Sequence, residues 1–289
     1  MRYVDAPFAL LSRRGFLVTG VAALTAANAF GDPACTLGSE QEEGPYYIDD
    51  ETVRRDITEG KPGVPLLLAV RLVDSRNCAP LRNAALDVWH CDALGVYSGF
   101  TANSPDEGRG GPPPEFGRDG FFPGMPPPPF GRGGRGGPPS RQTDATRYLR
   151  GAQLSGDNGL AEFLTVYPGW YSGRAIHIHV KVHVGGAAAR KYAGGHVAHT
   201  GQLFFPEDLT ERVARLAPYA ARVGVHRTTQ AEDGVFNSQH GAEGMLKIER
   251  LGKRDEDGFR ATATLAIDPE ASPSPVDGFG GRGGRPRRG

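Results

Sequence analysis

Two histidines, His177 and His179, stand two positions apart in a segment of alternating polar and apolar residues. In an extended strand, side chains at positions i and i+2 point to the same face, so both imidazoles face one way. Ile176, Ile178 and Val180 then lie on the opposite, apolar face. Two imidazoles held close together on a rigid strand provide half of a metal site. The sequence therefore predicts a metal-binding strand whose other face packs in a core.

Two tyrosines could complete such a site. Tyr171 precedes His177 and follows a turn at Pro168-Gly169, which allows its side chain to reach the same face. Tyr97 follows a second turn, at residues 92–95. Because a phenolate is a hard and strongly donating oxygen ligand, a tyrosine that joined the histidines would favour a hard, oxidised metal ion.

Each of these residues also has a simpler interpretation. The two histidines could be surface or core-satisfied residues of a strand, and Tyr97 could be a simple rim residue. Tyr171 could be a packing residue, and Arg174 a solvated loop charge rather than the cation that balances an anionic substrate in a buried site. His90 and His183 are further possible ligands. At the rise of a strand, however, His183 lies roughly 13 Å from His179, so it cannot share a metal with it without a bulge.

Many short strands must position these residues. Runs rich in β-branched and aromatic residues alternate with turn signals, and this pattern predicts an all-β fold, an antiparallel β-sandwich. Residues 147–154 and 159–166 are expected to form a strand pair joined by a turn at 155–158. The other expected strands span residues 64–73, 84–91, 176–184, 201–205, 245–251 and 259–267.

One short helix is expected. Leu209, Val213 and Leu216 share one side of a helical pattern over residues 208–222. Pro218 is expected to kink this helix or to end it early.

Composition divides the chain of 289 residues into a core and low-complexity segments. The insertion at 104–140 and the tail at 272–289 are dominated by Gly, Pro and Arg, a composition that cannot bury enough apolar surface to order itself. The sandwich domain is therefore expected over residues 30–271. A formal net charge of zero gives no bulk attraction to nucleic acid.

The first 29 residues predict an export signal. Arg13 and Arg14 form the arginine pair of a twin-arginine signal, an apolar stretch follows at 16–27, and Ala27-Asn28-Ala29 is a cleavage site. An exported protein with no membrane span after cleavage is expected; the alternative is an uncleaved anchor. Three cysteines in an oxidising compartment predict one disulfide and one free thiol, with all three pairings open.

Longer segments resemble a known family. Residues 86–100 and 149–182 look like the core of the intradiol ring-cleavage dioxygenases, non-haem ferric enzymes related to protocatechuate 3,4-dioxygenase and catechol 1,2-dioxygenase. Residues 43–49 and 200–205 also fit, and the joint pattern W-x7-Y, P-G-x-Y and R-x2-H-x-H is highly specific. The short spacing between Tyr171 and His177 is similar to that of a smaller, exported branch. The resemblance implies a β-sandwich of the intradiol dioxygenase type.

The resemblance also implies a site and a reaction. Fe(3+) would be held by Tyr97, Tyr171, His177 and His179, and Arg174 would stabilise substrate and intermediates. The enzyme would use O2 to cleave a catechol-type ring to a cis,cis-muconate-type product.

Further roles follow from the same resemblance. Tyr171 would be the catalytic tyrosine that leaves the metal, and Gln202 would support the site from nearby. Tyr167 falls on no ligand position of the family. Family members are commonly assembled, so a homodimer is possible.

Two other hypotheses remain at this point. A non-catalytic β-sandwich module could bind aromatic or polymeric ligands, although such a module predicts incomplete metal ligands. A copper or zinc site could use the histidines alone, without the tyrosines.

Overall fold

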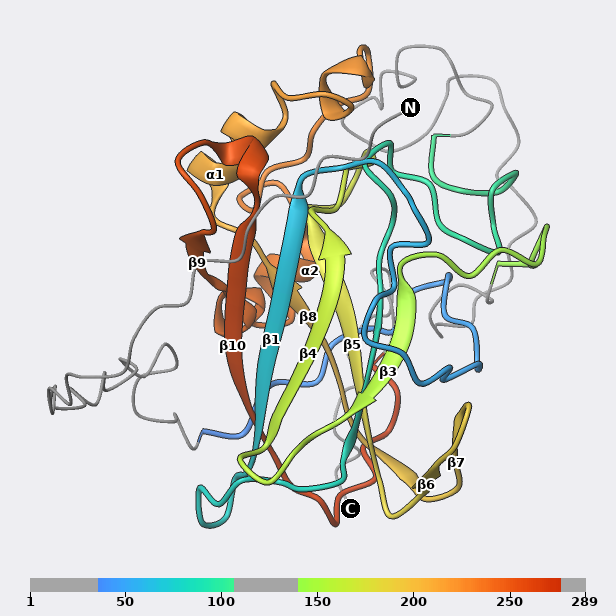
Figure 1. The fold of residues 1–289 in the computed structure, drawn as a ribbon, viewed down its shortest axis with the longest axis vertical. Helices are drawn as coiled ribbons and strands as arrows, with labels where there is room; N and C mark the ends of the chain where they lie inside the picture. Colours follow the sequence, from blue (N-terminus) through green and yellow to red (C-terminus); the bar gives the residue numbers. More distant parts are fainter. Residues whose placement is uncertain (1–35, 107–139, 277–289) are drawn as a thin grey trace, which may run out of the picture.

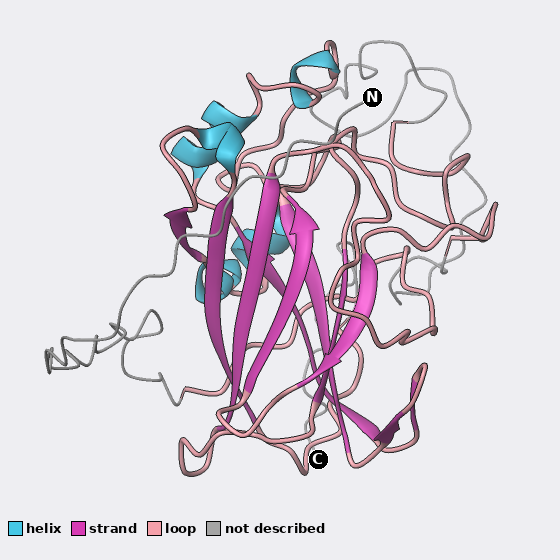
Figure 2. Ribbon diagram, in the orientation of Figure 1, coloured by secondary structure: helices cyan, strands magenta, loops and turns pink. Residues whose placement is uncertain are grey.

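The computed structural model describes residues 36–106 and 140–276, and most of its ordered elements are strands (Figures 1 and 2). The expected insertion and tail fall largely, and the export signal and Cys35 entirely, outside the described residues. The strands are β1 Pro65–Asp74, β2 Ala85–Trp89, β3 Arg150–Leu154, β4 Leu160–Val166, β5 His177–Val184, β6 Ala187–Ala188, β7 Tyr192–Ala193, β8 His196–Phe204, β9 Lys247–Arg250 and β10 Phe259–Ile267. The helices are α1 Glu207–Val213 and α2 Gly234–Ser238, with 3-10 turns at Tyr219–Ala221, Gly241–Gly244 and Asp255–Asp257.

Two four-stranded sheets stack to form the sandwich. One has the order β4-β1-β10-β9 and the other β3-β2-β5-β8, and Figure 1 shows the first sheet lying in front of the second. All pairs within them are antiparallel except β1 with β10, which run parallel. The predicted all-β antiparallel sandwich is thus confirmed. Its one parallel pair is formed by the first and the last strand of the sandwich.

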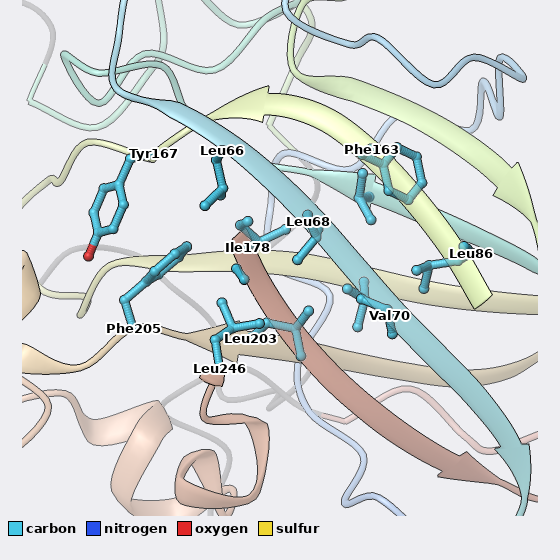
Figure 3. Close-up of a cluster of buried hydrophobic side chains, with 14 of the residues drawn as sticks. Leu66, Leu68, Val70, Leu86, Phe163, Tyr167, Ile178, Leu203, Phe205 and Leu246 are labelled. Carbon is cyan, nitrogen blue, oxygen red and sulfur yellow. The ribbon is translucent and has the colours of Figure 1, made fainter. Parts of the chain in front are cut away.

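The core lies between the two sheets. Figure 3 shows Leu66, Leu68 and Val70 from β1 facing Ile178 and other side chains of the second sheet. These side chains are at most a few per cent exposed. Burial of each stabilises the fold by roughly 1.5–3 kcal/mol. The core thereby fixes β5, whose opposite face carries the histidines.

One pairing prediction is wrong. β3 and β4 follow each other through a turn at residues 155–159, but they do not pair: β3 pairs with β2 in one sheet, and β4 pairs with β1 in the other. The turn residues indicate where the chain reverses. They do not indicate whether the returning strand stays in its sheet or crosses to the facing one.

The helix predicted over residues 208–222 is present, but it is shorter than predicted. α1 ends at Val213, and only a 3-10 turn follows Pro218. The second helix, α2, was not predicted. Asp233 caps it by accepting hydrogen bonds from the backbone N–H groups of Val235 and Phe236.

A long N-terminal arm, residues 38–57, crosses the second sheet before β1 begins. Its backbone N–H groups bond to strands far along the chain: Gln41 N–H to the Thr200 carbonyl, Arg54 N–H to that of Ala152, and Ile57 N–H to that of Leu164. The arm covers the face of β5 that is turned away from the core. Every residue of β5 is therefore buried.

The two described cysteines differ in their bonding. Cys78 is disulfide-bonded, and Cys91 is a buried free thiol. Within residues 36–106 and 140–276, no helix has the length and apolar character that crossing a membrane requires.

Candidate metal centre

β5 presents His177 and His179 on the face beneath the N-terminal arm. Both histidines are at most 3% exposed, and their Nε2 atoms lie 3.0 Å apart. The strand alternation predicted from the sequence is thus present, with Ile178 and Val180 on the core face. The indole of Trp89, next to His179 in register on β2, stacks on the His179 imidazole with 4.9 Å between ring centroids.

The two tyrosines come from loops on either side of this strand pair. Tyr97 follows β2, and Tyr171 lies in the connection from β4 to β5. The Tyr171 hydroxyl lies 3.3 Å from His177 Nε2 and 3.3 Å from the Tyr97 hydroxyl. The structure therefore brings all four predicted ligand side chains together, with their donor atoms forming one buried group.

The donor atoms fit a cation better than they fit one another. His177 Nδ1 lies 2.6 Å from the Ala175 carbonyl oxygen, which can only accept a hydrogen bond, so Nδ1 carries the proton and Nε2 has a lone pair. His179 Nδ1 has no hydrogen-bond partner among the described residues, so no contact there fixes which of its ring nitrogens carries the proton. A metal ion at the centre would use both Nε2 lone pairs. Two phenolic oxygens with two imidazoles form a donor set suited to iron.

Burial sets the protonation states of the four groups. It lowers the pKa of His177 and His179, so both imidazoles are neutral and available as ligands. It raises the pKa of Tyr97 and Tyr171 above the usual value for a phenol. Without a nearby cation both phenols stay protonated, whereas a bound metal ion would favour the phenolates.

Arg174 is held by a network that the histidine motif does not reveal. Its guanidinium donates to Asp233, to Glu42 at 3.1 Å, and to the Gln202 side-chain oxygen at 2.5 Å. Asp233 is fully buried, and it also accepts a hydrogen bond from the Ala175 backbone N–H. From the sequence, Arg174 was either a solvated loop charge or the cation that balances an anionic substrate. In the structure its side chain is 14% exposed and pairs with two carboxylates, so it is not a solvated loop charge.

The N-terminal arm packs over the four clustered side chains. The Tyr46 ring stacks on the Tyr97 ring with 4.6 Å between centroids. Gly44 has a φ of +75°, and a Cβ added there would lie 3.1 Å from His179 Cε1. Only glycine combines this backbone conformation with so close an approach. Glu42, Gly44, Tyr46 and Asp233 had no predicted role in the site.

Signals for these missed residues were present but incomplete. Residues 43–49 matched the family pattern, which marked the arm without assigning functions to its side chains. Asp233 precedes Gly-Val-Phe, a pattern compatible with a helix N-cap. Neither signal indicates that Glu42 of the arm and Asp233 contact Arg174, because those contacts join residues more than 50 positions apart.

Three other candidates lie outside the group. Tyr167 is a core residue whose hydroxyl bonds to Thr210. His90 is satisfied by the Cys91 carbonyl and the Thr165 hydroxyl. His183 lies farther along β5 and contacts none of the four predicted ligands.

Comparisons with known proteins agree with this fold. A family model described as a dioxygenase matches residues 42–111. A solved intradiol ring-cleavage dioxygenase from Tetranychus urticae is 29% identical with a TM-score of 0.64, and the alignment covers 83% of this chain and 98% of that one. A second solved dioxygenase is 30% identical with a TM-score of 0.62 and the same coverage. A search of curated proteins gave no match. Given the fold, the family match and these relatives, the chain belongs to the intradiol ring-cleavage dioxygenases.

Proposed function

We propose that this enzyme uses Fe(3+) and O2 to cleave a catechol-type ring between its two hydroxylated carbons, giving a cis,cis-muconate-type product. The observation that carries the proposal is the buried convergence of Tyr97, Tyr171, His177 and His179, in which the donor atoms of successive residues in this order lie 3.0–3.3 Å apart. Family membership supports ring cleavage of a catechol by a non-haem iron enzyme. The ferric state rests on the two phenolic ligands.

When bound, ferric iron would supply the Lewis acidity that binds a catechol through its oxygens and prepares the ring for O2. The protein's own groups handle the protons. Tyr171 is 8% exposed, whereas Tyr97 is fully buried beneath Tyr46. The Tyr171 phenolic oxygen is therefore the better placed of the two to accept a proton from a substrate hydroxyl.

Arg174 and Gln202 would orient the substrate and favour negative charge near it. Gln202 is the register neighbour of His179, and its amide is fixed by Arg174 and by the Glu42 carbonyl. The Arg174 cation lowers the pKa of Tyr171 against the larger effect of burial. Fixed donors of this kind stabilise developing charge without having to reorganise during the reaction.

The tyrosines provide the test, because the alternative copper or zinc site uses the histidines alone. Tyr97→Phe is expected to lower iron content and to remove most of the visible tyrosinate-to-iron absorption. Tyr167→Phe is the matched control, since that buried tyrosine lies in the core away from the cluster. Metal analysis and visible spectra of the purified proteins give the answer. Unchanged metal content in Tyr97→Phe would favour the histidine-only site.

Export by the twin-arginine route is a second proposal, which rests on residues 12–29 of the sequence. Replacement of both Arg13 and Arg14 by Lys should retain the protein in the cytoplasm, because the export machinery reads the arginine pair. Cell fractionation measures this directly. Equal export of the variant and the wild type would refute the proposal.

A further inference from the structure

A second group of potential ligands lies on the same sheet face, beyond the tyrosine-histidine cluster. Asp87 on β2, His183 on β5 and Glu51 on the N-terminal arm each direct one ligand atom to a common point, and these atoms lie within 4.8 Å of one another. Lys181 separates His183 from His179 on this face of β5. At about 3.3 Å per residue, His183 is roughly 13 Å from His179, so the two groups are separate.

The imidazole of His183 has no partner there. Its Nε2 is buried without a hydrogen bond among the described residues, and its side chain is 10% exposed. Nε2 lies 3.8 Å from Glu51 Oε1, which is too long for a hydrogen bond. Glu51 Oε1 accepts instead from the Tyr47 hydroxyl at 2.7 Å. A buried nitrogen directed at carboxylates and bonded to none of them needs an explanation.

The carboxylates around it outnumber the cations. Asp87 is 5% exposed, and burial together with Glu51 raises its pKa well above that of an ordinary aspartate, although Lys181 opposes the shift. Burial also raises the pKa of Glu51. The Lys181 ammonium is already engaged by Glu43 and by the Tyr47 ring, 3.3 Å from its centroid. Arg150 also acts on Asp87, but its guanidinium donates to Ser98. Among the described residues, neither Asp87 nor Glu51 forms an ion pair with a lysine or an arginine.

We propose that Asp87, Glu51 and His183 form a second metal site, which takes a divalent ion of the zinc class. One imidazole and two carboxylates are ligands that Zn²⁺ accepts, with water free to complete the coordination. Metal-ligand bonds near 2.0–2.2 Å require the ligand atoms to draw together by about 1 Å, a change that side-chain rotations can provide. The ion would use the unpartnered Nε2 and compensate both carboxylates.

Such an ion would fasten the N-terminal arm to the sheet. Glu51 belongs to the arm, and its carbonyl accepts a hydrogen bond from the Tyr192 N–H. Asp87 and His183 belong to the sheet, on neighbouring strands. In the same arm, Glu42 forms an ion pair with Arg174, and Gly44 packs against the His179 ring. The second site would thus be structural, holding in place the segment that closes the first.

Zinc binding to the iron-loaded full chain tests the proposal without any measure of activity. Equilibrium dialysis against Zn²⁺ followed by metal analysis should give one zinc per chain in addition to the iron, and zinc should raise the melting temperature. Asp87→Asn and His183→Gln should each lose the zinc and keep the iron. His196→Gln is the control, because His196 pairs in register with Val184, on the opposite face of the sheet.

Three results would overturn the proposal: no retained zinc in the wild type, a gain of zinc matched by a loss of iron, or zinc retained by both variants. If the buried substitutions prevent folding, Glu51→Gln on the arm replaces them and should lose the zinc. Substitution of Co²⁺ for the zinc in the wild type adds a test that needs no variant. Co²⁺ absorption should then show bound nitrogen and oxygen ligands, and an aqua-ion spectrum would contradict the site.

Discussion

Asp233 is the residue on which the placement of Arg174 depends most. It is fully buried, accepts from Arg174 Nε and the Ala175 N–H, and caps α2. Asp233→Asn removes the charge that compensates a buried guanidinium, so the free energy of unfolding should fall by about 3 kcal/mol. Turnover should fall as well, because Arg174 and Gln202 lose their fixed orientation.

Urea unfolding and steady-state kinetics of the purified variant check both effects. Asp208→Asn is the control, since the Asp208 side chain is 77% exposed and its ion pair with Arg212 lies within α1. A fully active and fully stable Asp233→Asn protein would show that this network does not position Arg174.

His90 predicts a dependence of stability on pH. Burial lowers its pKa from 6.5 to about 4, and its two ring nitrogens are satisfied in the neutral form. Between these pH values the unfolded chain binds a proton that the folded chain does not. The free energy of unfolding should therefore fall as the pH drops from 6.5 to 4, by up to about 3 kcal/mol from this residue.

Comparison of the wild type with His90→Gln isolates this contribution from those of the other buried histidines. The variant should lose less stability than the wild type between pH 6.5 and 4, as measured by urea unfolding at several pH values. Parallel pH profiles for the two proteins would show that His90 titrates normally.

At the scale of elements, the N-terminal arm packs against two of the proposed metal ligands, His179 and Tyr97. Gly44→Ala places a Cβ 3.1 Å from the His179 ring at a φ of +75°, so it should strain the backbone by roughly 1–2 kcal/mol and also displace His179. Gly60→Ala is a matched control with a φ of +73° and open space around the added Cβ.

The two variants should lose similar stability, and only Gly44→Ala should lose metal and activity. Thermal unfolding and iron analysis separate the two effects. Equal iron content in both variants would show that the arm is not seated on His179.

The sequence predicted elements better than it predicted their partners. The alternation in β5 was readable because its core face is continuously apolar, and this placed His177 and His179 correctly. The separation of β3 from β4 into two sheets was not readable, because a turn at residues 155–159 suits both outcomes. The capped helix α2 is only five residues long, too short for an apolar period to show.

At the scale of the whole molecule, the site exists only where distant segments meet. β5 supplies both imidazoles, two loops supply the tyrosines, and the arm and α2 supply the groups around Arg174. The family resemblance predicted from local motifs the four side chains that the structure brings together. Local motifs could not predict the carboxylates that compensate Arg174, because those contacts form only when the sheets are stacked and the arm crosses them.

The most direct test of the account is product analysis after reaction of the iron-loaded protein with catechol under ¹⁸O₂. Cleavage between the hydroxylated carbons predicts consumption of O2 and a ring-opened dicarboxylic acid that carries label in its carboxylates. Mass spectrometry of the product measures this, and Tyr167→Phe should behave as the wild type does. A hydroxy-aldehyde product, or no consumption of O2 by iron-loaded protein, would contradict the proposed reaction.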